Sequence, residues 1–238
     1  MHRELAGLSS MATRPILADL CDHLRTVHHV PVRFESAGGV EVARRIRGGA
    51  AADLLVLADG AMTALAREGL LRAGTLRPLW VSQVVAAVPA GAPAPALATV
   101  ADLRAALTSA ARIACSTGPS GTALTGLLDR LGLAGALAGR LVQVPPGVPA
   151  GSLLSSGRAD LAFQQHSELM DLPGVTVLGP LPGDTALTSL FTAGVPATAA
   201  DPARSLAALD LLASDRAADL ARARGMAPAD PARPGRRV

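Results

Sequence analysis

The chain has 238 residues, enough for one large domain or two lobes with sizeable cores. Half of the residues are hydrophobic but only 2% are aromatic, so an aliphatic core is expected and stacking platforms for single-stranded nucleic acid are largely excluded. The formal net charge of +3 is accounted for by arginines of the C-terminal tail, so no nucleic-acid partner is expected.

The first half of the chain alternates between strand and helix patterns. Helices are predicted near Thr13, with Thr13 as N-cap and Pro15 in the first turn, and then after Gly39 and from Asp59. Strands are predicted before each of these helices, at residues 3–8, 30–34 and 53–58.

The second half continues the alternation after a long apolar strand at 80–88 and a Pro/Ala/Gly loop at 89–95. The remaining predicted strands are 112–115, 141–144, 160–163, 175–178 and 187–195. The remaining predicted helices are 100–109, one ending near 131, 153–156, 202–212 and 216–224. From residue 227 onward, Pro, Ala and Arg predict a flexible basic tail.

Four short turns rich in Ser, Thr and Gly lie where a predicted strand passes into a helix. They are Ser9–Pro15, Glu35–Val40, Cys115–Ala123 and Phe163–Leu169. Such turns present hydroxyls and backbone N–H groups at helix N-termini, where negative charge is favoured. Alternating strands and helices predict a mostly parallel α/β sheet, whose ligands lie beyond the carboxyl ends of the strands. The turns therefore predict a site for a small anion.

Neither the cysteines nor the histidines follow a metal-binding pattern. Cys21 and Cys115 are too few for a disulfide framework, and CxxC and HExxH motifs are absent. We expect no metal and no other cofactor. Residues 1–15 show no secretory signal pattern, and the chain contains no apolar run long enough to span a membrane. A cytoplasmic protein without membrane insertion is therefore expected.

These segments together resemble a known family. The motifs SSMATR, ESAGGV, ADLLVLADGAM, STGPSG, VPPGVP and FQQHSELMDLPGV are similar to those of type II periplasmic-binding proteins of the molybdate-binding branch. The resemblance implies two lobes, each a mostly parallel sheet flanked by helices, with the ligand bound between them. Lobe 1 is expected to comprise residues 1–78 and 190–238, and lobe 2 residues 79–189.

The resemblance also implies which groups hold the anion. In molybdate receptors, hydroxyls and backbone amides of such turns hold the oxyanion, which points here to Ser9 or Ser10, to Ser36 with its following amides, and to the loop around Val148 to Gly151. We add the glycines and hydroxyl residues of the same turns as ligand-binding candidates: Gly38, Gly39, Ser116, Thr117, Ser120 and Gly121.

The chain departs from the receptors in ways that favour a carboxylate ligand. Many receptors use a Tyr hydroxyl in the second lobe, but this chain has no Tyr and carries Gln164, Gln165 and Glu168 in that region. Arg14 is expected at the mouth of the cleft, where a guanidinium can bind a carboxylate bidentately.

The same family contains aconitate isomerase, so the first functional hypothesis is a cofactor-independent isomerase of a small unsaturated di- or tricarboxylate. A 1,3-proton shift needs anion sites and a positioned acid/base. The candidates are Glu35, Glu168 and His166, with Cys115 a distant fourth. Structural alternatives remain open: Glu35 paired with Arg14 or Arg44, Glu168 at a helix start, and His166 facing solvent.

The second hypothesis is a non-catalytic solute-binding protein for molybdate or another small anion, with an ABC permease as its partner. Both hypotheses share the same turns and the same anionic ligand class, so the sequence leaves both open.

Overall fold

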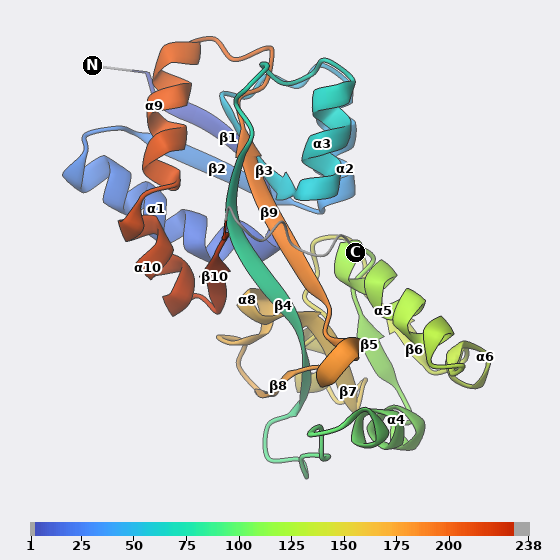
Figure 1. Cartoon of the computed structure of the whole chain (residues 1–238). Helices are drawn as coiled ribbons and strands as arrows, with labels where there is room; N and C mark the ends of the chain where they lie inside the picture. Colours follow the sequence, from blue (N-terminus) through green and yellow to red (C-terminus); the bar gives the residue numbers. More distant parts are fainter. Residues whose placement is uncertain (1–2, 231–238) are drawn as a thin grey trace. The chain divides into compact units, whose positions relative to one another are not determined.

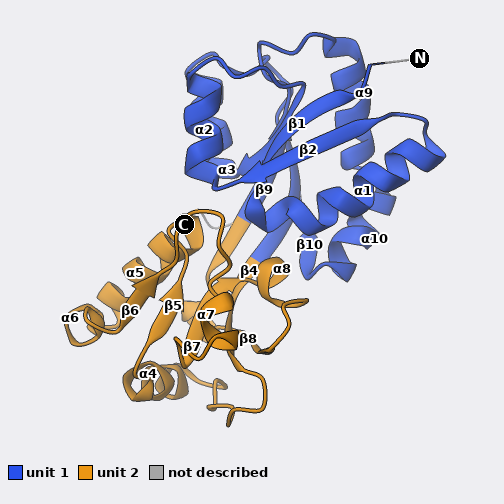
Figure 2. Ribbon diagram, turned by 180° about the vertical axis from the view of Figure 1, so that it is seen from behind, with its two compact units in different colours: residues 1–82, 190–237 blue, residues 83–189, 238 orange. Residues whose placement is uncertain are grey.

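The computed structural model describes residues 3–230. These residues form two compact units (Figure 2). Unit 1 contains residues 3–82 and 190–230, and unit 2 contains residues 83–189. The chain passes between the units after Ser82 and after Ser189, whereas the sequence placed the first of these boundaries after residue 78.

The sheet of unit 1 begins with three parallel strands. β1 (Leu5–Ser10) lies between β2 (Val32–Ala37) and β3 (Leu54–Ala58). β9 (Thr188–Gly194) is antiparallel to β3, and β10 (Met226–Pro228) is antiparallel to β4 (Arg77–Pro89). The helices are α1 (Arg14–Val27) after the 3-10 turn η1 (Met11–Thr13), α2 (Gly39–Arg47), α3 (Asp59–Arg67), α9 (Pro202–Leu212) and α10 (Asp215–Ala223) (Figure 1).

Unit 2 repeats the parallel arrangement. β5 (Ile113–Cys115) lies between β6 (Leu141–Gln143) and β7 (Leu161–Gln165), and β7 and β8 (Val175–Pro180) are antiparallel to β4. The helices are α4 (Val100–Ser109), α5 (Pro119–Arg130), α6 (Ala134–Leu137), α7 (Ser152–Ser155), α8 (His166–Leu169) and the 3-10 turn η2 (Gly183–Thr185).

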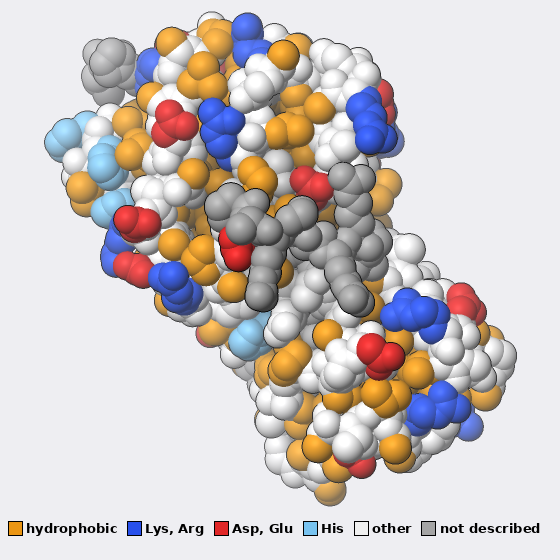
Figure 3. Space-filling model, in the orientation of Figure 1, with side chains coloured by type: hydrophobic (Ala, Val, Ile, Leu, Met, Phe, Trp, Pro, Cys, Tyr) orange, Lys and Arg blue, Asp and Glu red, His pale blue; other side chains and the backbone are white. Residues whose placement is uncertain are grey.

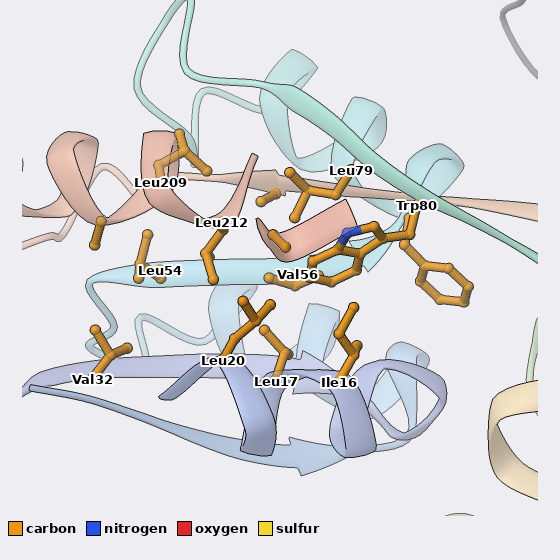
Figure 4. Packing of buried hydrophobic residues seen from close by; sticks show 14 of the residues in the cluster. Ile16, Leu17, Leu20, Val32, Leu54, Val56, Leu79, Trp80, Leu209 and Leu212 are labelled. Atoms are coloured by element: carbon orange, nitrogen blue, oxygen red, sulfur yellow. The ribbon is translucent and has the colours of Figure 1, made fainter. Parts of the chain in front are cut away.

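Both faces of the unit 1 sheet are buried, which explains the unbroken apolar sequence of β3. Leu54 and Val56 face a cluster built from α1, α9 and α10, which includes Trp80 (Figure 4). Leu55 and Leu57 face the opposite way, toward α2 and α3. A strand buried on both faces has no need of polar alternation.

Unit 2 follows the same rule. Leu161 and Phe163 of β7 pack with α4 and α5, whereas Ala162 packs on the other face near α7 and α8. β7 continues for two polar residues, Gln164 and Gln165, both buried, beyond the expected end at Phe163. The strand therefore delivers two carboxamides to its carboxyl end.

Thr13 is the N-cap residue of α1 and Pro15 lies in the first turn, both as expected, although the Thr13 hydroxyl makes no capping bond and donates to the backbone carbonyl of Ser10 at 3.0 Å. One local expectation is corrected. The expected tail does not begin at residue 227, because Met226–Pro228 form β10 and the Ala229 N–H donates to the Leu79 carbonyl. Residues 231–238 of that tail lie outside the described residues.

The surface shown in Figure 3 intermixes acidic and basic side chains over the described elements. Within residues 3–230, no helix combines the length and apolarity needed to cross a membrane.

Candidate functional site

The parallel strands β1 and β2 bring serine hydroxyls together at their carboxyl ends. Ser9 is in register with Ser36, and their hydroxyl oxygens are 2.8 Å apart. Ser9 is fully buried and Ser36 is partly buried. One hydroxyl of the pair donates to the other, which leaves the second hydroxyl with a hydrogen to donate to a ligand.

The neighbouring candidates of unit 1 lie at the same edge. Ser10 is buried and precedes η1, and its hydroxyl oxygen is 3.4 Å from that of Thr13. A Cβ atom placed on Gly39 would lie 3.9 Å from the Ser10 Cβ, so the start of α2 lies beside Ser10. We call this group of residues the unit 1 polar edge: Ser9, Ser10, Ser36, Gly38 and Gly39.

Glu35 is not suited to proton transfer. Its side chain is exposed and forms a bidentate ion pair with Arg45, at 2.6 and 3.1 Å. The hydrogen bond and the charge of Arg45 lower the pKa of Glu35, so the carboxyl stays ionised at neutral pH. The partner is neither Arg14 nor Arg44, which were the expected ones. Arg14 itself is exposed and lines a hollow between α1 and β2.

The third turn of the sequence forms a tight, internally bonded start of α5. The Ser116 and Ser120 hydroxyl oxygens are 2.8 Å apart, and Ser116 Oγ accepts from the Gly118 N–H at 3.2 Å. A Cβ atom on Gly121 would lie 1.8 Å from the Ser116 carbonyl oxygen, so only glycine fits there. Gly121 is therefore structural, while Thr117 remains exposed on the turn.

At the end of β7, Gln164 joins a loop to an acidic side chain. Its Oε1 accepts from the Ala150 N–H at 2.6 Å, and its Nε2 donates to Glu168 Oε1 at 2.7 Å. Gln164 is 1% exposed and Ala150 is fully buried. Gln164 was expected to contact ligand, but both ends of its carboxamide are occupied by the protein. Its observed role is to position Glu168.

Glu168 has the protonation behaviour that acid/base chemistry needs. Burial raises the pKa of its carboxyl to about 7, although the hydrogen bond from Gln164 acts in the opposite direction. A group with a pKa near neutrality is both protonated and ionised in comparable amounts under physiological conditions, which is the ideal for general acid/base catalysis.

Gln165 differs from Gln164 in having an unused polar atom. Its Nε2 donates to the Ser189 hydroxyl at 2.7 Å, but its buried Oε1 has no hydrogen-bond partner among the described residues. Buried polar atoms nearly always form a hydrogen bond, so the Gln165 Oε1 atom is expected to bind a ligand or a water molecule. We call the following group the unit 2 polar edge: Ser116, Ser120, Gln164, Gln165 and Glu168.

The structure gives less support to the remaining candidate site residues, His166, Val148 and Cys115. His166 is the first residue of α8 and is partly buried. The Val148 N–H donates to the Pro145 carbonyl at 3.1 Å, so it is already used within its turn. Cys115 packs in the unit 2 core, and burial raises the pKa of its thiol, which leaves it unreactive.

Some contacts were missed by sequence reasoning because their partners are distant in the chain. Thr192 Oγ1 donates to Asp59 Oδ1 at 2.9 Å, which links β9 to the first residue of α3 across 133 positions. The Ala150–Gln164 bond is another example. Within the described part of the chain, no group of three or more His, Cys, Asp or Glu residues is arranged to hold a metal ion.

Comparison with known proteins agrees with this architecture. The chain is 27% identical over 225 residues to an aconitate isomerase of Pseudomonas sp., which covers 88% of this chain and 85% of that protein. The structure is similar to the periplasmic molybdate-binding protein of Azotobacter vinelandii, with a TM-score of 0.81, 20% identity and coverage of 95% of this chain and 100% of that one. It is also similar to the sulfate-binding protein of Mycobacterium tuberculosis, with a TM-score of 0.75, 18% identity and coverage of 97% and 88%.

The two solved structures have the two-lobed α/β fold of periplasmic binding proteins, and at these identities they establish the fold alone. The family model described as bacterial extracellular solute-binding protein matches residues 5–227, nearly the whole described chain. The chain therefore belongs to the bacterial extracellular solute-binding protein family.

Proposed function

We propose that this protein is a cofactor-independent isomerase of a small unsaturated di- or tricarboxylate, acting by an allylic 1,3-proton shift like that of aconitate isomerase. The observation that carries the proposal is Glu168, a carboxyl with a pKa of about 7 that Gln164 holds in one orientation. The 27% identity to an aconitate isomerase over most of both chains supports it.

The chemistry is balanced without a redox partner. The Glu168 carboxylate takes a proton from the methylene carbon that lies between a carboxylate and the carbon–carbon double bond. The electron pair of the broken C–H bond delocalises over the allylic system and its carboxylate as a dienolate. The protonated Glu168 then returns a proton to the far allylic carbon, the double bond moves by one position, and Glu168 is an anion again.

The polar edges supply groups suited to the carboxylates and to the developing charge. The Ser9–Ser36 and Ser116–Ser120 pairs each have a hydroxyl hydrogen left to donate. Gln165 adds a carboxamide that can turn by 180°, because the Ser189 hydroxyl can donate to Oε1 as readily as it accepts from Nε2. In the turned state, Nε2 is the free donor for a carboxylate.

Wild-type protein mixed with trans-aconitate tests the proposal. Proton NMR is expected to show the cis isomer growing in until equilibrium, at a rate proportional to protein concentration. The matched variants are Glu168→Gln, which keeps an acceptor for Gln164, and Glu41→Gln, which changes an exposed carboxyl paired with Arg44. Isomerisation by Glu41→Gln and not by Glu168→Gln is expected.

A second function is non-catalytic binding of a tetrahedral oxyanion, as a solute-binding protein that serves an ABC permease. The likeness to a molybdate-binding protein and the serine pairs favour it. Tight molybdate binding in calorimetry, together with unchanged trans-aconitate, would establish this alternative. Under the isomerase proposal, the protein is cytoplasmic, as expected from the sequence. Cell fractionation tests this location independently of the activity.

A further inference from the structure

Unit 1 contains a concave site on the flank of α1. The hollow has a volume of about 310 Å³ and is lined by residues of α1 and of the edge strand β2. These two elements are labelled in the ribbon of Figure 2. Its α1 side is formed by Arg14, Ala18, Cys21 and Arg25, which share one face of the helix because they are spaced by three or four residues.

The floor of the hollow is apolar. Leu17 and Val32 are buried members of the unit 1 core and line it from α1 and from β2. Phe34 completes the floor, and its ring lies directly over Gly7, where an added Cβ atom would come within 2.4 Å of the ring. Gly7 thus leaves room for the ring, and Phe34 presents a partly exposed apolar surface to the hollow.

Among the described residues, the charges around the hollow leave the Arg14 guanidinium without an ion-pair partner. Arg33 pairs with Glu4 at 3.4 Å, and Arg25 pairs with Asp22 at 2.8 Å, so these lining charges balance. Arg14 has no ion-pair partner within residues 3–230. The hollow therefore combines a guanidinium that is unpaired within the described part of the chain with an apolar floor, and Glu4 and Asp22 repel any further negative charge on a ligand.

We propose that this hollow is a binding site for a small monocarboxylate with an aromatic or branched aliphatic body. The carboxylate pairs with the Arg14 guanidinium, next to the Ser36 hydroxyl, and the body covers Leu17, Val32 and Phe34. A free guanidinium is a bidentate partner for one carboxylate. The hollow shares Ser36 with the unit 1 polar edge, but all of its lining residues belong to unit 1, and the proposal does not depend on the acid/base chemistry proposed for Glu168.

Cys21 provides a reporter inside the hollow. Its thiol is partly exposed, whereas Cys115 is buried in unit 2. Burial raises the pKa of the Cys21 thiol to about 11, so alkylation by N-ethylmaleimide is slow and is best followed in mildly alkaline buffer. A ligand in the hollow covers the thiol and slows its alkylation further.

The probe is benzoate, and peptide mass spectrometry of the full chain measures the alkylation of Cys21. Benzoate is expected to slow it about tenfold at saturation, with a dissociation constant on the order of 1 mM for a ligand of this size. Benzyl alcohol, which has the same ring without the charge, is expected to protect at least about tenfold more weakly, because it lacks the Arg14 ion pair.

Two variants test the location. Ala18→Trp fills the hollow from an exposed helical position, and Ala207→Trp adds the same side chain at an exposed position of α9. Benzoate protection is expected to survive Ala207→Trp and to be lost in Ala18→Trp, where benzoate also no longer gives saturation-transfer signals in NMR. Arg14→Met, which keeps the aliphatic stem, is expected to remove the preference for benzoate over benzyl alcohol.

The proposal is overturned if benzoate leaves Cys21 alkylation unchanged up to about 50 mM, well above the expected dissociation constant. It is also overturned if both tryptophan variants behave alike, or if Arg14→Met prefers benzoate as strongly as the wild type.

Discussion

Gln164 donates a 2.7 Å hydrogen bond to Glu168 while accepting one of 2.6 Å from the Ala150 backbone. A single buried carboxamide thus ties the acid/base candidate of α8 to the loop that precedes α7. The strand supplies the carboxamide, and the short helix that follows supplies the carboxyl. The result is one carboxyl group, that of Glu168, with a fixed orientation and a raised pKa.

The raised pKa of Glu168 predicts a pH-dependent stability. The folded-state pKa of about 7 exceeds the ordinary value of 4.5, so the folded chain binds this proton more tightly than the unfolded chain. The contribution to stability is fully present below about pH 4.5 and is lost as the pH rises through 7, by at most about 3 kcal/mol.

Urea unfolding at pH 5 and pH 8 measures this effect. Glu168→Gln is expected to be more stable than the wild type at pH 8 and to lose the part of the pH dependence that lies between those values. Glu41→Gln, at an exposed ion pair, is expected to keep the wild-type profile. Equal pH profiles for the wild type and Glu168→Gln would contradict the assigned pKa.

Gln164→Leu is expected to destabilise the chain by about 1–3 kcal/mol, because the Ala150 N–H is left buried without an acceptor. It also removes the hydrogen bond that lowers the pKa of Glu168, so that pKa rises further. Urea unfolding and the pH dependence of activity measure the two effects. Gln143→Leu, an exposed change on β6, is the matched control, and equal losses in both variants would contradict the bridging role.

Alanine substitutions at two glycines of α5 are expected to change the stability in opposite directions. Gly121→Ala is expected to destabilise by about 2–4 kcal/mol, because its Cβ atom would collide with the Ser116 carbonyl. Gly126→Ala, with nothing within 4 Å of the added atom, is expected to stabilise the same helix by about 0.5–1 kcal/mol. Thermal unfolding of both variants is the measurement, and a stable Gly121→Ala variant would show that the turn is not built as described.

The unit 1 polar edge is tested by removing its hydroxyls. Ser9→Ala and Ser36→Ala are each expected to weaken binding of trans-aconitate about tenfold, which corresponds to one lost hydrogen bond to a charged group. Calorimetry compares them with Ser109→Ala, whose hydroxyl bonds only to the Ala106 carbonyl of α4. Unchanged affinity in both unit 1 variants would mean that the serine pair is structural.

The spacing of apolar residues predicted helices and strands well where one face of the element is apolar. The helices expected at residues 100–109 and 202–212 have those bounds in the structure. β7 was expected to end at Phe163, because Gln164 and Gln165 break the apolar pattern, although their backbones still pair with Val85 and Val84. α6 and β10 were missed because each is too short to show a period.

The site was only partly predictable for a different reason. The polar turns identified the residues, since hydroxyls and carboxamides at strand ends have few other uses. Their roles depended on partners that spacing does not reveal. Glu35 pairs with Arg45 because α2 packs against β1, the strand next to β2. The Gln164 carboxamide oxygen accepts from the Ala150 N–H because a loop folds back on β7. Such contacts depend on tertiary packing.

The central claim is that Glu168 moves a proton of the substrate, and solvent exchange tests it most directly. In heavy water, the wild type is expected to introduce deuterium at the allylic carbons of trans-aconitate. Proton NMR measures this exchange as the loss of the signals of the allylic protons. Glu168→Gln is expected to slow this exchange by about 10²–10⁴-fold, the usual contribution of a general base, while still binding the substrate. Exchange at the wild-type rate in Glu168→Gln, or no exchange in the wild type, would contradict the account.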